Sequence, residues 1–182
     1  MNKIGIFFGT ETGTTRLVAK KLHQLLGADL ADKPVNVNRI QPEDMLAYDA
    51  LILGTPSYGI GDIPGKNAAG CFEPNWEEFL TTFGKPDLSG KRIAFFGLGA
   101  QERYSEQFAS SLMALYTVFE SLGAEIIGDW STEGYTFKHS DAVRDGRFVG
   151  LVIDQRTQGM LTEERLKQWL AQITPALKEK LT

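Results

Sequence analysis

Apolar residues recur along the chain in two alternating patterns. Short, nearly continuous apolar runs are typical of strands that are buried on both faces. They occupy residues 4–8, 50–54, 92–99, 125–128 and 148–153, with a weaker run at 35–37. Between these runs, apolar residues return every three or four positions, as on the buried face of a helix. The helical repeats are Val18, Leu22, Leu25 and Leu26; Trp76, Phe79, Leu80 and Phe83; Phe108, Leu112, Leu115, Phe119 and Leu122; and Leu166, Trp169, Leu170, Ile173 and Leu177.

This alternation of strands and helices predicts a parallel sheet covered by helices on both faces. Asn75, three residues before Glu78, predicts a capping box at the start of one helix. Two segments, 59–74 and 129–147, match neither pattern, and loops of that length are uncommon without a function. Because the chain has no internal repeat or linker, residues 1–182 are expected to form a single domain.

Composition narrows the class of protein. The chain has 182 residues, of which 42% are hydrophobic and 23% charged, and its net charge is −4. That acidic balance argues against a nucleic-acid-binding protein. One cysteine, Cys71, excludes a disulfide framework and a cysteine-held iron–sulfur cluster. His23 and His139 have no neighbouring ligands, so no metal site is expected. No apolar run reaches the length of a membrane span or of a signal peptide, which leads us to expect a cytoplasmic protein.

The turn after the first strand favours an anion-binding site. It reads Gly9-Thr10-Glu11-Thr12-Gly13-Thr14-Thr15 and leads directly into a predicted helix. Free backbone N–H groups and the helix dipole favour negative charge at such a position. The turn has no lysine and is not a Walker loop, so a single phosphate is favoured over a triphosphate with magnesium. The alternative is a turn that its own hydroxyls cap.

Aromatic residues follow two further strands at the same sheet edge. Tyr58 lies in the turn after the third strand, and Tyr104 lies beyond Gly97-Leu98-Gly99 after the fourth. Ligands of open α/β sheets bind beyond the carboxyl ends of the strands. Each loop alone can be an ordinary surface turn. The three together predict a site for a flat ring that carries a phosphate.

These three segments together resemble the flavodoxin family, and the resemblance runs over nearly the whole chain. Segment 129–147 resembles the insertion that splits the last strand of long-chain flavodoxins, and the 59–74 loop resembles that of flavodoxins associated with nitrogen fixation. The resemblance implies an α/β fold with a doubly wound, five-stranded parallel sheet in the order 2-1-3-4-5, its last strand split by the insertion.

The resemblance also implies non-covalent binding of FMN, with no catalytic and no metal-binding residues. Residues 10–15 would bind the phosphate, and Tyr58 and Tyr104 would flank the isoalloxazine ring. The Gly59 carbonyl would accept a hydrogen bond from flavin N5 after one-electron reduction. The expected cofactor-binding residues are Thr10, Glu11, Thr12, Gly13, Thr14, Thr15, Thr55, Pro56, Ser57, Tyr58, Gly59, Gly97, Leu98, Gly99, Gln101, Tyr104 and Gln107.

The sequence departs from the family pattern at several of these loop positions. Aspartate is usual where this chain has Ala100, and glycine is frequent where it has Arg103. Tryptophan is common at the position of Tyr58, and a larger residue such as asparagine at that of Gly59. Backbone contacts to the ring would survive the change to Ala100, whereas a side-chain contact would be lost, which would alter the redox potentials.

The expected function is that of a low-potential one-electron carrier that uses the semiquinone/hydroquinone couple of FMN. The resemblance implies a monomer that accepts electrons from flavodoxin reductase or pyruvate oxidoreductase and donates them to nitrogenase reductase. An acidic surface would attract a basic partner face over long range.

Two alternatives share the expected fold. An FMN-dependent NAD(P)H/quinone reductase would oxidise NAD(P)H steadily with a quinone and without a partner protein. A phospho-receiver domain would need acidic residues at the strand ends, where this chain has Phe8-Gly9 and Leu53-Gly54.

Overall fold

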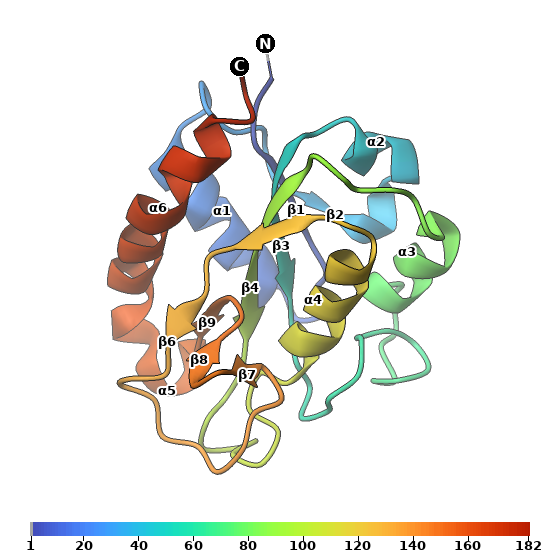
Figure 1. Cartoon of the computed structure of the whole chain (residues 1–182). Helices are drawn as coiled ribbons and strands as arrows, with labels where there is room; N and C mark the ends of the chain where they lie inside the picture. The colour runs from blue at the N-terminus through green and yellow to red at the C-terminus, as the bar shows by residue number, and fades with distance from the viewer. Residues whose placement is uncertain (1) are drawn as a thin grey trace.

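A parallel sheet lies between two layers of helices in the computed structural model, which describes residues 2–182 (Figure 1). The strand order is β2-β1-β3-β4-β5, and β9 also pairs with β4. The doubly wound order expected from the sequence is therefore confirmed. The strands of this sheet are β1 (Gly5–Phe8), β2 (Val35–Asn36), β3 (Ala50–Thr55), β4 (Arg92–Leu98), β5 (Glu125–Ile127) and β9 (Leu151–Ile153).

Helices cover both faces of the sheet. In Figure 1, α1 and α6 lie on one face and α3 and α4 on the other. The α-helices are α1 (Thr14–Leu26), α2 (Pro42–Leu46), α3 (Trp76–Phe83), α4 (Ser111–Ser121), α5 (Gln155–Gln158) and α6 (Thr162–Lys178), and the short 3-10 turns are η1 (Val37–Arg39) and η2 (Gly159–Leu161). Within the part of the chain that the structure describes, no helix has the length and apolar character needed to cross a membrane.

The strands divide their side chains between two cores because successive residues point to opposite faces. Phe7, Leu53 and Phe95 belong to the core that includes Trp76 of α3 and the buried residues of α4. Their neighbours Phe8, Ile52 and Phe96 belong to the core beneath α1 and α6. Strands buried on both faces explain the continuous apolar runs in the sequence.

The last strand of the sheet is split, as the sequence resemblance implied. β5 pairs with Arg92–Ala94 of β4, and β9 pairs with Phe96–Leu98 of the same strand. Between them the chain leaves the sheet and forms a small antiparallel sheet in the order β6-β8-β7. Its strands are β6 (Trp130–Ser131), β7 (Val143–Arg144) and β8 (Arg147–Phe148).

Two sequence predictions about this region were wrong. Segment 129–147 is not free of regular structure, and residues 148–153 are not one strand, because Phe148 belongs to β8. The chain re-enters the sheet directly after Gly150, where an added Cβ would lie only 2.3 Å from the Phe95 carbonyl oxygen. Alternation cannot show which sheet a strand joins, so the apolar run concealed the break.

Smaller differences occur at element ends. α4 begins at Ser111 rather than Phe108, because Ala109 has a positive φ of 52°. Val37 leaves the second strand for η1. Leu25, expected on the buried face of α1, is 38% exposed. α2 and α5 were missed because five and four residues are too few to display a helical period.

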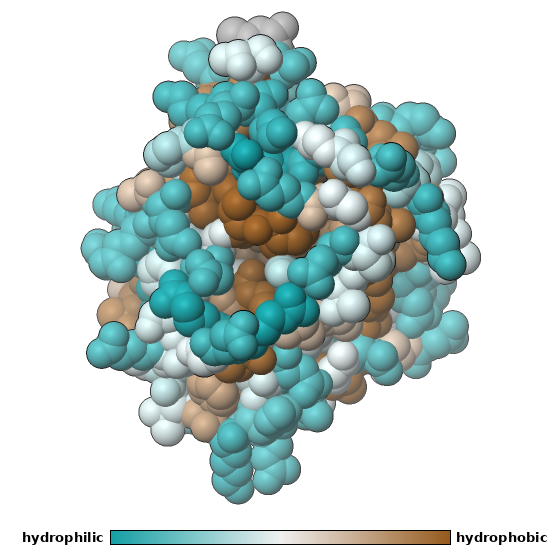
Figure 2. Space-filling model, in the orientation of Figure 1, coloured by the Kyte–Doolittle hydropathy of each residue, from teal (hydrophilic) through white to brown (hydrophobic). Residues whose placement is uncertain are grey.

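One edge of the sheet reaches the molecular surface. Figure 2 shows a hydrophobic area at the centre of the molecular face turned toward the viewer. The edge strand β5, the unlabelled yellow-orange arrow in Figure 1, crosses this face. Ile126 and Ile127 of β5 are half-buried. The loops that follow the strands lie at the opposite end of the molecule from the two chain termini.

Candidate functional site

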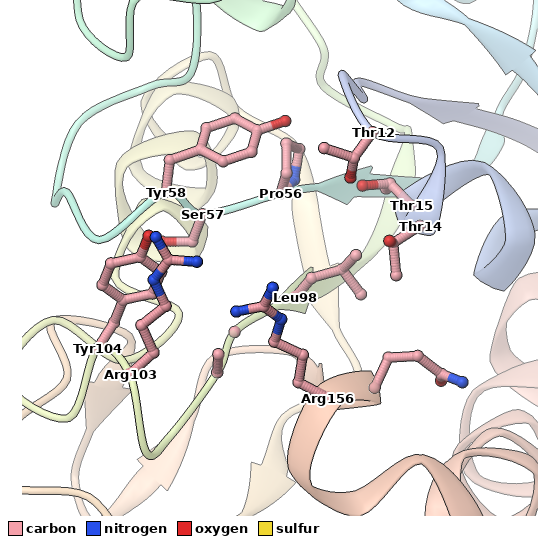
Figure 3. Close-up of a pocket in the computed structure, with 13 residues that line it drawn as sticks. Thr12, Thr14, Thr15, Pro56, Ser57, Tyr58, Leu98, Arg103, Tyr104 and Arg156 are labelled. Carbon is pink, nitrogen blue, oxygen red and sulfur yellow. The ribbon is translucent and has the colours of Figure 1, made fainter.

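A cavity of about 210 Å³ opens among the loops at the carboxyl ends of the strands. Threonine hydroxyls lie at one end of it, and the rings of Tyr58 and Tyr104 lie at the other (Figure 3). Its lining residues are Thr12, Thr14, Thr15, Pro56, Ser57, Tyr58, Leu98, Gly99, Ala100, Arg103, Tyr104, Gln155 and Arg156.

The threonine end of the cavity coincides with the N-terminus of α1. Gly13 is the N-cap residue and supplies no side-chain cap, so N–H groups of the first turn stay available. The Thr10 hydroxyl accepts a hydrogen bond from Gly13 N at 3.0 Å and shapes the turn. Thr15 Oγ1 is buried and has no hydrogen-bond partner within residues 2–182. A bound anion would satisfy these donors.

The loop after β3 brings an aromatic ring to the other end. Thr55 is buried at the strand end, and its hydroxyl donates to the Pro56 carbonyl at 2.9 Å. Ser57 Oγ donates to the Ile60 carbonyl at 3.4 Å. Burial raises the pKa of the Tyr58 phenol above its ordinary value of 10.0, and Cys71 and Glu11 raise it further. Tyr58 therefore presents a neutral aromatic surface at physiological pH.

The loop after β4 meets this loop at Gly59. A Cβ on Gly59 would lie 2.4 Å from Cδ1 of Tyr104, and the φ of Gly59 is 75°. Glycine is therefore required twice at this position, for its backbone conformation and for space. Gly99 is likewise covered, because a Cβ there would lie 2.7 Å from the Phe108 ring. The Tyr104 ring thus packs against the backbone of the loop that carries Tyr58.

Gln101 joins the Tyr104 loop to two other segments rather than to the cavity. Its Nε2 donates to Asp154 Oδ2 at 2.8 Å, and its Oε1 accepts from Thr136 N at 2.6 Å. Asp154 is the N-cap of α5 and accepts from Thr157 N at 2.9 Å. Gln107 Oε1 is buried without a partner among the described residues.

The insertion holds the Tyr104 loop from behind. The Ser105 carbonyl accepts hydrogen bonds from Lys138 N and His139 N, both at 2.9 Å. Phe108 N donates to the His139 carbonyl at 3.1 Å. A cluster of aromatic rings fills the space beneath, namely Phe108, Tyr135, Phe137 and Phe148. The insertion is therefore packed into the site's support.

Glu11 faces the 59–74 loop instead of the cavity. Its carboxylate accepts a hydrogen bond from Phe72 N. The neighbouring Cys71 is buried, and burial, followed by Glu11, Glu78 and Glu77, raises its thiol pKa to about 11. A thiol that stays protonated is a poor nucleophile, so Cys71 is a packing residue. Among residues 2–182 no cluster of histidine, cysteine and acidic side chains is arranged to hold a metal ion.

The structure divides the residues that the sequence selected into two groups. Those that line the cavity are Thr12, Thr14, Thr15, Pro56, Ser57, Tyr58, Leu98, Gly99 and Tyr104. Those that do not line it are Thr10, Glu11, Gly13, Thr55, Gly59, Gly97, Gln101 and Gln107.

Sequence reasoning did not select Ala100, Arg103, Gln155 or Arg156 as site residues. Gln155 and Arg156 directly follow β9, at the same sheet edge as the other loops. Their position directly after the last strand could have identified Gln155 and Arg156 as site residues, because the carboxyl ends of parallel strands meet at one edge of the sheet.

Comparison with known proteins gives a consistent result. The flavodoxin family model matches residues 6–169. A flavodoxin from Klebsiella pneumoniae is 48% identical over 173 residues, which are 95% of this chain and 97% of that protein. One from Enterobacter agglomerans is 46% identical over 178 residues, covering 97% and 99% of the two chains. The crystal structure of Fusobacterium nucleatum flavodoxin bound to flavin mononucleotide superimposes with a TM-score of 0.84 at 30% identity, covering 97% and 99% of the chains.

Proposed function

The chain belongs to the flavodoxin family, and on that premise we propose that it carries electrons one at a time on non-covalently bound FMN. Flavodoxins are electron-transfer proteins rather than enzymes. The flavin ring supplies the redox chemistry, and the protein binds, orients and shields it.

One observation of the structure carries the assignment of the cofactor. The cavity has available N–H groups and threonine hydroxyls at one end and two tyrosines at the other. FMN has a phosphate at one end and a flat aromatic ring at the other. The buried, unpartnered Thr15 Oγ1 supports this fit, because a buried hydroxyl without a partner is costly unless a ligand satisfies it.

The residues would then divide the work of binding. The turn of residues 10–15 would hold the phosphate by neutral donors and the α1 dipole. Tyr58 and Tyr104 would cover the ring and exclude water from it. By family resemblance, the Gly59 carbonyl would accept a hydrogen bond from N5 of the reduced flavin ring.

The finer parts of the function are also proposals. The carrier would work at low potential as a cytoplasmic monomer. Its electrons would come from flavodoxin reductase or pyruvate oxidoreductase and go to nitrogenase reductase. The length of the 59–74 loop and its likeness to the loop of nitrogen-fixation flavodoxins support this acceptor.

A reductive titration of the purified protein under anaerobic conditions tests the carrier function. The expected result is a yellow protein that accumulates a one-electron-reduced form, with long-wavelength absorbance, before it bleaches. A direct passage to the two-electron-reduced protein would contradict the proposal, as would a protein that stays colourless after FMN is added. Steady NAD(P)H oxidation with a quinone alone would instead favour a reductase.

The acceptor is tested separately by stopped-flow mixing of the reduced protein with oxidised nitrogenase reductase. Rapid transfer that slows as salt is added is expected, because charge attraction between the partners is screened. Absence of electron transfer would contradict the proposal that nitrogenase reductase is the acceptor, but it would not contradict the carrier function.

A further inference from the structure

Two guanidinium groups line the cavity whose other residues are uncharged. Arg103 comes from the loop after β4, and Arg156 comes from α5 after β9. Figure 3 shows both side chains beside the cavity, Arg103 next to Tyr104 and Arg156 between the tyrosine and threonine ends. Arg103 Cζ lies 5.2 Å from the centre of the Tyr104 ring. Neither arginine forms an ion pair with any carboxylate of residues 2–182.

None of the acidic groups nearest in sequence lines the cavity. Glu102 does not line the cavity, and Glu106 pairs with Lys138 at 3.5 Å. Asp154 is buried and accepts hydrogen bonds from Gln101 and Thr157. Glu11 binds Phe72 N. The cavity is therefore locally positive, although the whole chain has a net charge of −4.

We propose that Arg103 and Arg156 act as a cation pair that favours the negatively charged, fully reduced form of the bound flavin. This inference rests on the proposed function. In the proposed couple the second electron would enter the ring without a proton and would add a negative charge to the cofactor. Nearby positive charge lowers the free energy of that state and raises the potential of the second electron. Arginine keeps its positive charge at all physiological pH values.

The charge effect differs from a packing effect in what it changes. A packing contact would strengthen binding of oxidised and reduced FMN alike. A charge contact would strengthen binding of the fully reduced cofactor more. It would also weaken as salt is added, because both arginines are exposed and the screening length at physiological salt is about 8 Å.

The test uses the FMN-loaded full chain with Arg103→Gln, Arg156→Gln and the double variant. Arg39→Gln is the matched control, since Arg39 is an exposed arginine outside the cavity. The two one-electron midpoint potentials are measured together with the dissociation constant of oxidised FMN. We expect the double variant to weaken fully reduced FMN about tenfold relative to the preceding redox state, which lowers the second potential by about 59 mV.

The proposal is overturned if the glutamine variants at Arg103 and Arg156 have the same second potential as Arg39→Gln. It is also overturned if these variants bind FMN equally weakly in all redox states. Arg→Lys variants at both positions keep the charge and should keep the potential; a shift as large as that of the glutamine variants would show a packing role. If the unmodified protein binds no FMN, the proposed function itself fails instead.

Discussion

At the scale of single residues, the site depends on groups that have space or a hydrogen bond left over. Gly59 has no room for a side chain, and Thr15 has a hydroxyl without a partner in the described structure. The sequence identified the tyrosines and threonines because their residue types and spacing reveal them. It did not reveal Arg103 or Arg156 as lining residues, because an exposed arginine carries no periodic signal.

Substituting Gly59→Ala should displace Tyr104 and weaken FMN binding. The added Cβ would meet the Tyr104 ring, and the positive φ adds strain of about 1 kcal/mol. Gly70→Ala is the control, because its φ is 65° and nothing lies within 4 Å of the added Cβ. FMN titration should show a loss for Gly59→Ala only, while chemical unfolding should show strain in both. Equal FMN affinities in the two variants would contradict the role given to Gly59.

Thr15→Val should separate binding from stability. The variant keeps the shape and removes a buried hydroxyl that has no protein partner. The apo protein should be as stable as the original, and FMN should bind about tenfold or more weakly, the value of one hydrogen bond to a charged group. Thr10→Val, by contrast, should destabilise the apo protein, because Gly13 N loses its hydrogen-bond acceptor. The claim fails if Thr15→Val destabilises the apo protein and leaves FMN affinity intact.

At the scale of elements, α3 organises the long 59–74 loop. Glu78 Oε1 accepts from Lys66 N at 2.8 Å, and Glu77 accepts from the N–H groups of Asn67 and Ala68. Glu78 also completes the capping box with Asn75 N at 2.9 Å, which confirms the capping box predicted from the sequence. The capping box could be predicted because its residues are close in sequence. The hydrogen bonds from the loop to Glu77 and Glu78 could not be predicted, because the partners are nine or more positions apart in sequence.

The hold of Glu78 on the loop should weaken in acid. Burial alone would raise the pKa of Glu78, but the N–H groups of Asn75 and Lys66 outweigh it and lower the pKa below 4.5. A folded-state pKa below the unfolded one gives stability that is present above about pH 4.5 and is lost as the pH falls through the folded value. Hydrogen exchange, corrected for intrinsic rates, should show residues 66–68 losing protection in that range.

Glu78→Gln should weaken this protection already at neutral pH and reduce its pH dependence. Glu73→Gln is the control, since Glu73 is an exposed loop carboxylate. If both variants retain the pH dependence of the original protein, Glu78 is not the group responsible.

At the scale of the whole molecule, the insertion is part of the fold's support rather than an appendage. Tyr135 joins the insertion to two other parts of the chain, β9 and α6, and also contacts Trp130 at the start of the insertion. Its hydroxyl donates to the Val152 carbonyl of β9, and it accepts from Trp130 Nε1 at 3.1 Å. Arg165 of α6 lies over its ring, with Cζ 4.0 Å from the centre. Periodicity predicted the main sheet and its helices, but these long-range contacts of an irregular segment have no local pattern.

Tyr135→Phe should therefore lower the free energy of unfolding of the whole chain by about 1–2 kcal/mol, because the buried Val152 carbonyl and the half-buried Trp130 indole both lose a hydrogen-bond partner. Tyr116→Phe is the control. Its hydroxyl donates to Glu120 at 2.8 Å and accepts from Arg144 of β7 at 3.2 Å, and because both contacts are exposed, water can replace them. Urea unfolding followed by two probes, one of them Trp fluorescence, measures both. Equal stabilities of the two variants would mean that the hydrogen bonds of the Tyr135 hydroxyl contribute little to the stability of the fold.

The split edge strand also bears on how such a protein can change over evolution. Ile127 pairs with Ala94 and Leu151 pairs with Phe96, so the chain leaves and rejoins the sheet only two positions apart along β4, roughly 7 Å. Ends that close can be joined by chains of very different length, and each doubling of that length costs only about 0.6 kcal/mol in closure entropy. Residues can be gained or lost at this point without altering the strand order. The segment inserted here supports the Tyr104 loop. Changes in its length or sequence can therefore alter the surroundings of the cofactor during evolution, while the sheet itself stays the same.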